Sequence, residues 1–191
     1  MSPLGAAALF ALVIVVAIVA FLALATYNAV IALQQRIDKA WANIDVALQQ
    51  RHSELPNLVA AVRDEMSYER TVLEDVTRLR AAYSPTAPIP DQAVTSEATS
   101  GAIRQLFAVM ERYPDLKSAT NVQALQDEIA RLETLIADRR ELYNDQVYRF
   151  NTRIAQVPAV ALAGAFGWLP RPFFAAEPGA ATAPSTDLET V

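Results

Sequence analysis

The N-terminal part of the chain is a continuous apolar segment. Residues Leu4 to Ala25 form a run of 22 residues without a charged or strongly polar side chain. As an α-helix this run would extend about 33 Å, close to the ~30 Å thickness of the hydrocarbon core of a bilayer. We therefore predict a transmembrane anchor over residues 1–26.

A different pattern follows the anchor, because apolar residues now recur at steps of three and four, which is typical of amphipathic helices. No Gly or Pro separates Ala25 from the start of this pattern, so we expect the anchor helix to continue to about Gln50. Tyr27 lies at the expected membrane exit, where aromatic residues are common. The apolar positions are Val30, Leu33, Ile37, Ala40, Trp41, Ile44 and Leu48.

The second helix is expected to follow a turn at residues 51–53. Ser53 is a good N-cap residue, because its hydroxyl can accept a hydrogen bond from a free N–H of the first helical turn. Pro56 would then lie in that first turn, where its missing N–H costs little. The apolar positions that follow predict a helix to about Ala82.

Two more helices complete the predicted body. The third begins between residues 91 and 101, after the proline-rich loop 84–91, and ends before Pro114, because a residue preceding proline disfavours α geometry. The fourth is a long helix over about residues 121–157. Four amphipathic helices with short connections predict an all-α protein in which the N-terminal transmembrane helix continues into an antiparallel up-down four-helix bundle over residues 27–158, with coiled-coil-like packing.

This topology places the loop 84–91 and the segment after Pro158 at the membrane end of the bundle. Residues 159–176 are apolar and aromatic. They either lie on the bilayer interface or fold back to cap the bundle. Residues 177–191 are rich in Ala, Pro and Thr, and we expect a disordered tail.

The charge pattern bears on partners and on orientation. The chain of 191 residues has a net charge of −5 and no Cys, which disfavours nucleic-acid binding and excludes disulfides and thiolate metal sites. Arg36 and Lys39 follow the anchor, so the positive-inside rule favours a single-pass protein of the cell (inner) membrane with a cytoplasmic bundle. Homo-oligomerisation is a further expectation, because small residues at positions 5–8 allow close helix approach.

An alternative interpretation treats the apolar run as a signal peptide. Ala23-Leu24-Ala25 has the small-x-small pattern of a cleavage site. Cleavage after Ala25 would release an exported, ligand-binding helical bundle. The absence of a basic residue before the run and the length of the run favour the uncleaved anchor.

A search for catalytic and metal-binding patterns finds none. Di-iron bundles use Glu-x-x-His pairs, but His52 is the only His and Gln occupies position 49. Ser53 beside His52 is interpreted as a helix cap, and the Gly-x-Ser-x-Gly turn of hydrolases and glycine-rich phosphate loops are both absent. We predict a protein without a catalytic, metal or cofactor site, which is not an enzyme.

Two groups of polar residues remain as candidates for a partner-docking or register role. Asn144 and Asn151 are seven residues apart, hence on one helical face, beside Tyr143 and Phe150; they either fix the register of the bundle or line a ligand groove.

The second group is expected at the membrane-distal end. There the turn at 51–53 and the turn after Tyr113 would bring Asp45, Arg51, Asn57 and Asp115 together. These side chains either cap local turns or form a partner-docking tip.

Seven short segments of the body carry a recognisable combination of residues: Tyr27-Asn28, residues 40–46 (AWANIDV), 55–59 (LPNLV), 113–117 (YPDLK), 125–128 (LQDE), Tyr143-Asn144 and Phe150-Asn151. Taken in order, these segments resemble the LemA family of bacterial membrane proteins. The resemblance implies a membrane-anchored helical bundle without an established enzyme activity or cofactor. One relative takes part in forming magnetosome membranes, so a role in protein interaction or membrane organisation is implied. Phe150 departs from the family pattern, which often has Tyr there.

Overall fold

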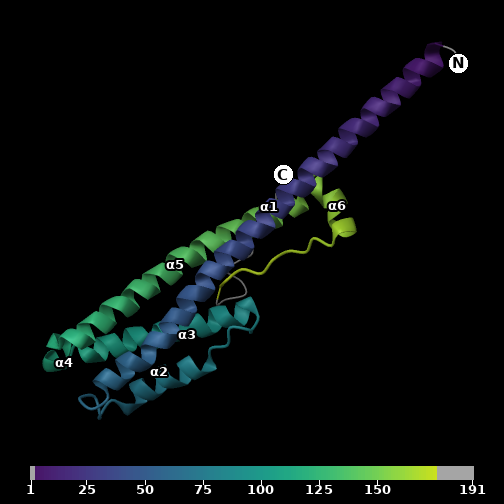
Figure 1. Ribbon diagram of the computed structural model, residues 1–191. Coiled ribbons are helices and arrows are strands. Elements are labelled where there is room, and N and C mark those ends of the chain that lie inside the picture. The colour runs from purple at the N-terminus through teal and green to yellow at the C-terminus, as the bar shows by residue number, and fades with distance from the viewer. Residues whose placement is uncertain (1–2, 176–191) are drawn as a thin grey trace, which may run out of the picture. The chain divides into compact units, whose positions relative to one another are not determined.

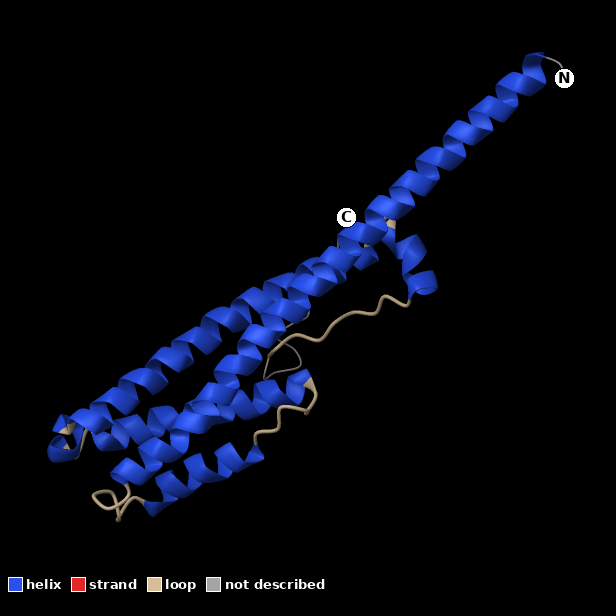
Figure 2. Ribbon diagram, viewed as in Figure 1, coloured by secondary structure: helices blue, strands red, loops and turns tan. Residues whose placement is uncertain are grey.

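The computed structural model describes residues 3–175, and every regular element in that range is an α-helix (Figure 2). This confirms the predicted all-α, bundle-like fold. The helices, labelled in Figure 1, are α1 (Pro3–Val62), α2 (Arg70–Ala82), α3 (Ile89–Met110), α4 (Pro114–Ser118), α5 (Thr120–Ala155) and α6 (Ala159–Phe166).

The chain divides into two compact units, which are described separately. Unit 1 consists of residues 1–39 and 145–171, and unit 2 of residues 40–144 and 172–191. Helices α1 and α5 each contribute to both units. The predicted tail, residues 177–191, lies outside the described residues.

Unit 1 contains the long apolar part of α1. The large apolar side chains between Leu9 and Leu24 are 43–70% exposed. By length and composition, α1 can cross a membrane. Further along, Val30 and Ile37 of α1 are buried at heptad spacing, and α5 buries Val147, Phe150 and Ile154 at steps of three and four. These positions follow the predicted apolar pattern.

Unit 2 has a continuous hydrophobic core to which five helices contribute. Apolar residues of α1, α2, α3 and α5 are buried here, together with Leu116 of the short helix α4. The core therefore closes one end of the unit around the turn between α1 and α2, where Met66 is fully buried.

The predicted turn at residues 51–53 is wrong, because α1 continues through it to Val62 with Pro56 inside the helix. Ser53 is not a cap; its hydroxyl donates to the carbonyl oxygen of Gln49 at 3.0 Å. Leu48, Arg51 and Leu55 are all buried, and their spacing of three and four residues continues one buried helical face through the predicted turn. Burial of this face favours a continuous helix.

The first reversal of the chain lies at residues 63–69 instead. Met66 N donates to Val62 O at 3.0 Å and Glu69 N to Met66 O at 2.9 Å, so the turn satisfies its own backbone groups. Consequently α2 has only 13 residues. The other boundaries agree more closely: α3 begins at Ile89, slightly before the predicted range, and α5 spans Thr120–Ala155.

The segment after Pro158 forms α6 and then an extended strap over residues 167–175. Its last part belongs to unit 2, where Phe174 is buried and contacts Trp41 with ring centroids 5.7 Å apart. The fold-back alternative therefore holds for residues 172–174. Helix α6 belongs to unit 1 and is treated below.

Candidate functional site

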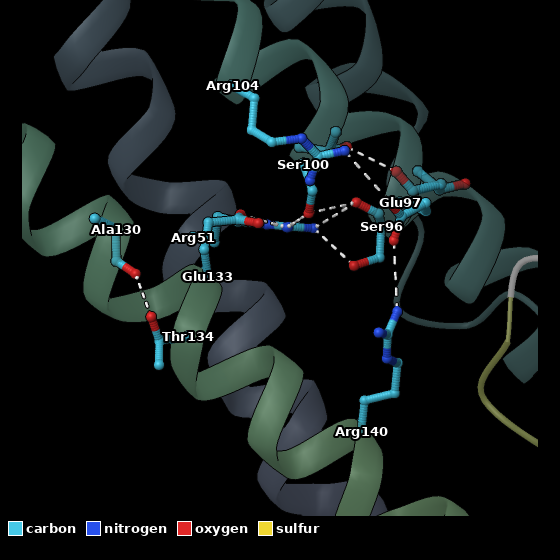
Figure 3. Close-up of polar contacts among 11 residues, drawn as sticks. Arg51, Ser96, Glu97, Ser100, Arg104, Ala130, Glu133, Thr134 and Arg140 are labelled. Carbon is cyan, nitrogen blue, oxygen red and sulfur yellow. Dashed lines mark hydrogen bonds and ion pairs between the residues drawn. The ribbon is translucent and has the colours of Figure 1, made fainter. Parts of the chain in front are cut away.

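A buried arginine lies at the centre of the polar interior of unit 2. Arg51 of α1 is 4% exposed, and its Nη1 donates to Glu133 Oε1 of α5 at 2.6 Å and to Ser100 Oγ of α3 at 2.9 Å. Its Nη2 donates to Ser96 Oγ at 3.0 Å. Figure 3 shows the guanidinium between these partners. Because the planar fork meets acceptors from two other helices, Arg51 fixes three helices relative to one another.

Small polar residues on α3 make room for this guanidinium. Gln92, Ser96 and Ser100 are four residues apart, on one face of α3, and all three are buried. Ser100 Oγ also donates to Ser96 O at 3.1 Å, so the hydroxyl is both donor and acceptor. A larger apolar residue at either serine would fill the space that the charged group needs.

A cavity of about 350 Å³ lies beside this network, between α3 and α5. Its walls combine the polar network with charged and apolar groups. The lining residues are Ala93, Ser96, Glu97, Ser100, Arg104, Glu133, Thr134, Ile136, Ala137, Arg140 and Phe174. The volume falls in the range of small-molecule pockets, so this cavity is the candidate binding site of unit 2.

The charged groups in the cavity wall are loosely paired. Glu97 accepts from Arg104 Nη2 through Oε1 and from Arg140 Nη1 through Oε2, both at 3.4 Å (Figure 3). All three side chains are well exposed, and such pairs contribute little to stability. The two guanidinium groups are therefore free to exchange Glu97 for another anionic group without a large loss of folding free energy.

The predicted distal cluster of Asp45, Arg51, Asn57 and Asp115 does not form. Arg51 lies in the bundle interior, and exposed Asn57 donates to Glu54 of its own helix at 3.2 Å. The reason is the continuous α1: twelve residues separate Asp45 from Asn57, about 18 Å along the helix.

Asp115 and Tyr113 lie at the start of α4. Asp115 is exposed in the first turn, and Tyr113 is the half-buried N-cap residue. Tyr113 N donates to Met110 O at 3.0 Å, which ends α3.

Asp45 instead pairs with Tyr83, the residue that follows α2. The Tyr83 hydroxyl donates to Asp45 Oδ1 at 3.2 Å. Burial, followed by the charge of Asp45 and this hydrogen bond, raises the pKa of Tyr83 to about 12. The phenol therefore stays protonated and remains a donor throughout the physiological pH range.

His52 packs against the same tyrosine, with ring centroids 5.2 Å apart. Its Nδ1 is buried and has no hydrogen-bond partner among residues 3–175. Burial first, and the charge of Arg80 second, lower the pKa of His52 below its ordinary value of 6.5. The imidazole is therefore neutral at physiological pH, and a proton on it would be poorly accommodated.

In unit 2, Asn144 holds the strap through its backbone. Asn144 Oδ1 accepts from Phe174 N at 2.9 Å, and its Nδ2 donates to Phe174 O at 3.2 Å. The neighbouring Tyr143 is fully buried and donates from its hydroxyl to Pro172 O at 2.9 Å. These bonds satisfy three backbone groups of an extended segment that has no ladder partner.

In unit 1, Asn151 makes the same pair of hydrogen bonds with the backbone of Arg171, three residues before Phe174. Asn151 Oδ1 accepts from Arg171 N at 2.8 Å, and its Nδ2 donates to Arg171 O at 3.0 Å. The spacings agree, because seven residues of helix rise about 10.5 Å and three extended residues span about 10 Å. Neither proposed role, helix register or a ligand groove, describes these amides; they bind the chain's own C-terminal segment.

Several residues of this site were not predicted, namely Ser96, Glu97, Ser100, Glu133 and Arg140. A signal for the serines was present, because the spacing of three and four that includes Ile103 continues backwards through Ser100 and Ser96. Small polar residues at such positions indicate a buried polar partner from another helix. Within residues 3–175, no three His, Asp or Glu side chains gather as a metal site.

The geometry defines a class of protein: a helical bundle with a buried polar network, built on a helix whose other part is exposed and apolar. The chain belongs to the LemA family, which it matches over residues 40–188. It is also similar to two curated proteins of Paramagnetospirillum magneticum, magnetosome proteins MamQ 1 and MamQ 2. Each is 24% identical over 196 aligned positions, which cover 88% of this chain and 72% of the relative.

Proposed function

We propose that the chain is a single-span protein of the cell (inner) membrane whose bundle is not an enzyme and acts in protein interaction or membrane organisation. The observation that carries this proposal is the exposure of the apolar side chains between Leu9 and Leu24. So long an apolar surface is unfavourable in water, whereas a bilayer is a matching solvent for it. Membership in the LemA family and the names of the two MamQ relatives support a membrane-related role.

A groove on unit 2 supports the interaction part of the proposal. It has a volume of about 730 Å³ and lies between the end of α1 and α2. Val59 and Leu73 contribute apolar side chains to its lining, and Arg63, Glu74 and Arg78 contribute charged groups. Apolar contacts combined with polar groups are the usual composition of a protein interface.

The orientation part of the proposal rests on Arg36 and Lys39, because the positive-inside rule favours a cytoplasmic bundle when basic residues follow the anchor. Self-association through the small residues at positions 5–8 is part of the same proposal. The competing function is an exported, ligand-binding bundle released by cleavage after Ala25. The cavity beside Arg51 is the observation that favours it.

The experiment is protease treatment of intact cells followed by intact-mass analysis of the membrane fraction. A full-length, membrane-bound chain with a protected C-terminal tail supports an anchored protein with a cytoplasmic bundle. Cleavage of the tail from outside contradicts the orientation. A soluble chain that begins at Thr26 contradicts the anchor and supports the exported bundle.

A further inference from the structure

Helix α6 in unit 1 is apolar on its outer face. Its eight residues, AVALAGAF, contain no polar side chain. Ala159 is buried, but Val160 and Phe166 are about half exposed, and the flanking Val157 and Leu169 are 82% and 75% exposed. A helix at the surface of a soluble protein normally presents polar residues outward, so this apolar face is not suited to contact with water.

Aromatic contacts within unit 1 fix the level of α6 along α1. The ring of Tyr27 lies 5.0 Å from that of Phe166 and 6.2 Å from that of Trp168 (centroid distances). Phe166 and Trp168 stack at 5.3 Å. Tyr27 comes two residues after the apolar run ends at Ala25, about 3 Å further along the helix. The three rings therefore lie at one level along the axis of α1, just beyond the end of the apolar run. This position is called the aromatic level below.

The charged residues of unit 1 lie beyond this level. Residues 154–170 carry no charge, and the first charge of α1 after the apolar run is Arg36. Further along α1, Asp38 pairs with Arg171 at 3.6 Å, and Asn151 binds the backbone of Arg171. Asp38 lies eleven residues after Tyr27, about 16 Å along the helix. An uncharged layer thus separates the apolar run from the charged part of the unit.

We infer that α6 and its flanks form a second membrane contact, which inserts Val157, Val160, Phe166 and Leu169 into the interfacial zone of one leaflet. The partner is the lipid bilayer, and the inference rests on the proposed anchoring by α1. If residues 4–25 span the hydrocarbon core, the aromatic level falls in the headgroup region, which is about 5–7 Å thick on each side. Aromatic belts occupy that region, and interfacial helices bury their apolar faces there to a depth of about 5–10 Å.

The test uses single spin labels, because the full chain has no native Cys. Val160→Cys and Leu169→Cys report on α6 and its flank. Tyr148→Cys is the matched control, because Tyr148 lies on α5 in the same unit and is 54% exposed, against 47% for Val160. Val16→Cys reports separately on the anchor. Each full-length variant is placed in vesicles of phosphatidylethanolamine and phosphatidylglycerol, and collision rates with oxygen and with a water-soluble nickel complex are measured.

Labels at positions 160 and 169 should show a several-fold higher ratio of oxygen to nickel collisions than the label at 148. The label at 16 should show a higher ratio still. A collision ratio typical of lipid at position 16, with ratios typical of water at positions 160 and 169, would overturn the inference and leave the anchor intact. A collision ratio typical of water at position 16 would overturn both the inference and the proposed anchor. Spin–spin broadening at 160 or 169 that disappears on dilution with unlabelled protein would assign the surface to a second copy of the chain and would also overturn it.

Discussion

Arg80 and His52 are joined by an unusual bond within unit 2: the Nε of Arg80 donates to the backbone carbonyl oxygen of His52 at 3.3 Å. In a regular helix this oxygen would accept from the N–H four residues later, but that residue is Pro56, which has none. A side chain of α2 therefore supplies the donor that proline removes from α1. The bond explains how a proline is tolerated in the interior of the longest helix.

This relationship predicts that the effects of mutations at positions 80 and 56 are coupled. Arg80→Met should lower the free energy of unfolding by about 1 kcal/mol, because a partly buried carbonyl loses its donor. In a Pro56→Ala background the loss should be smaller, since the alanine N–H again serves His52 O. Urea unfolding of the four proteins of this double-mutant cycle measures the coupling. Equal losses in both backgrounds would show that the bond does not compensate for proline.

Removal of the Arg51 guanidinium should be strongly destabilising. Arg51→Met leaves Glu133 and two serine hydroxyls without their partner in a largely buried place, and breaking such a pair costs about 3–5 kcal/mol. Chemical denaturation of the variant measures the loss.

The matched control is the Arg131–Glu128 pair of α5, which has the same 2.6 Å separation but is well exposed. Arg131→Met should have little effect on stability, because solvent screens an exposed pair. A similar, small loss for both variants would contradict a structural role for Arg51.

The partly buried imidazole of His52 predicts a pH dependence of stability. Because the pKa of His52 is lowered in the folded chain, the unfolded chain binds the proton more readily. The contribution of His52 to stability is therefore complete above its ordinary pKa of 6.5 and is lost progressively as the pH falls below it. The difference in urea midpoint between the wild type and His52→Phe, followed against pH, isolates this effect, because the chain has no other His. A difference that does not vary with pH would contradict the prediction.

The asparagine amides should protect the strap backbone from hydrogen exchange. In Asn144→Ala the amide of Phe174 loses its acceptor, and about 1 kcal/mol of lost bonding should speed its exchange about fivefold. In Asn151→Ala the same should happen at the amide of Arg171. Each variant is the control for the other in deuterium-exchange mass spectrometry. Acceleration at both amides in either single variant would indicate general loosening of the strap.

The helices were predictable where one apolar face is buried along its whole length. The apolar spacings of α5, together with Pro158 after its last turn, placed its ends within two residues of the observed ones. The first turn was missed because its actual residues, 63–69, contain neither Gly nor Pro, while Ser53 and Pro56 carry stronger local turn signals. The deciding partner, Arg80, lies 28 residues away from His52, beyond the reach of a local pattern.

The polar site was less predictable for a related reason. Arg51 occupies a core position of the apolar pattern of α1, and its partners are 45 to 82 residues distant in sequence. Nothing near Arg51 in the chain indicates whether a guanidinium at such a position points inward. Asn144 and Asn151 were correctly placed on one face, but their partners come from an irregular segment, which has no periodicity to interpret.

The strap also sets limits on which substitutions its own positions can accept. Asn144 and Asn151 bind only main-chain atoms, so any side chain at positions 171 and 174 preserves those bonds, with one exception: proline has no N–H to donate. The two prolines of the strap, at 170 and 172, alternate with these positions and avoid them. Sequence drift at positions 171 and 174 is thus restricted by a rule about one residue type, while the buried ring of Phe174 adds a requirement for size at position 174.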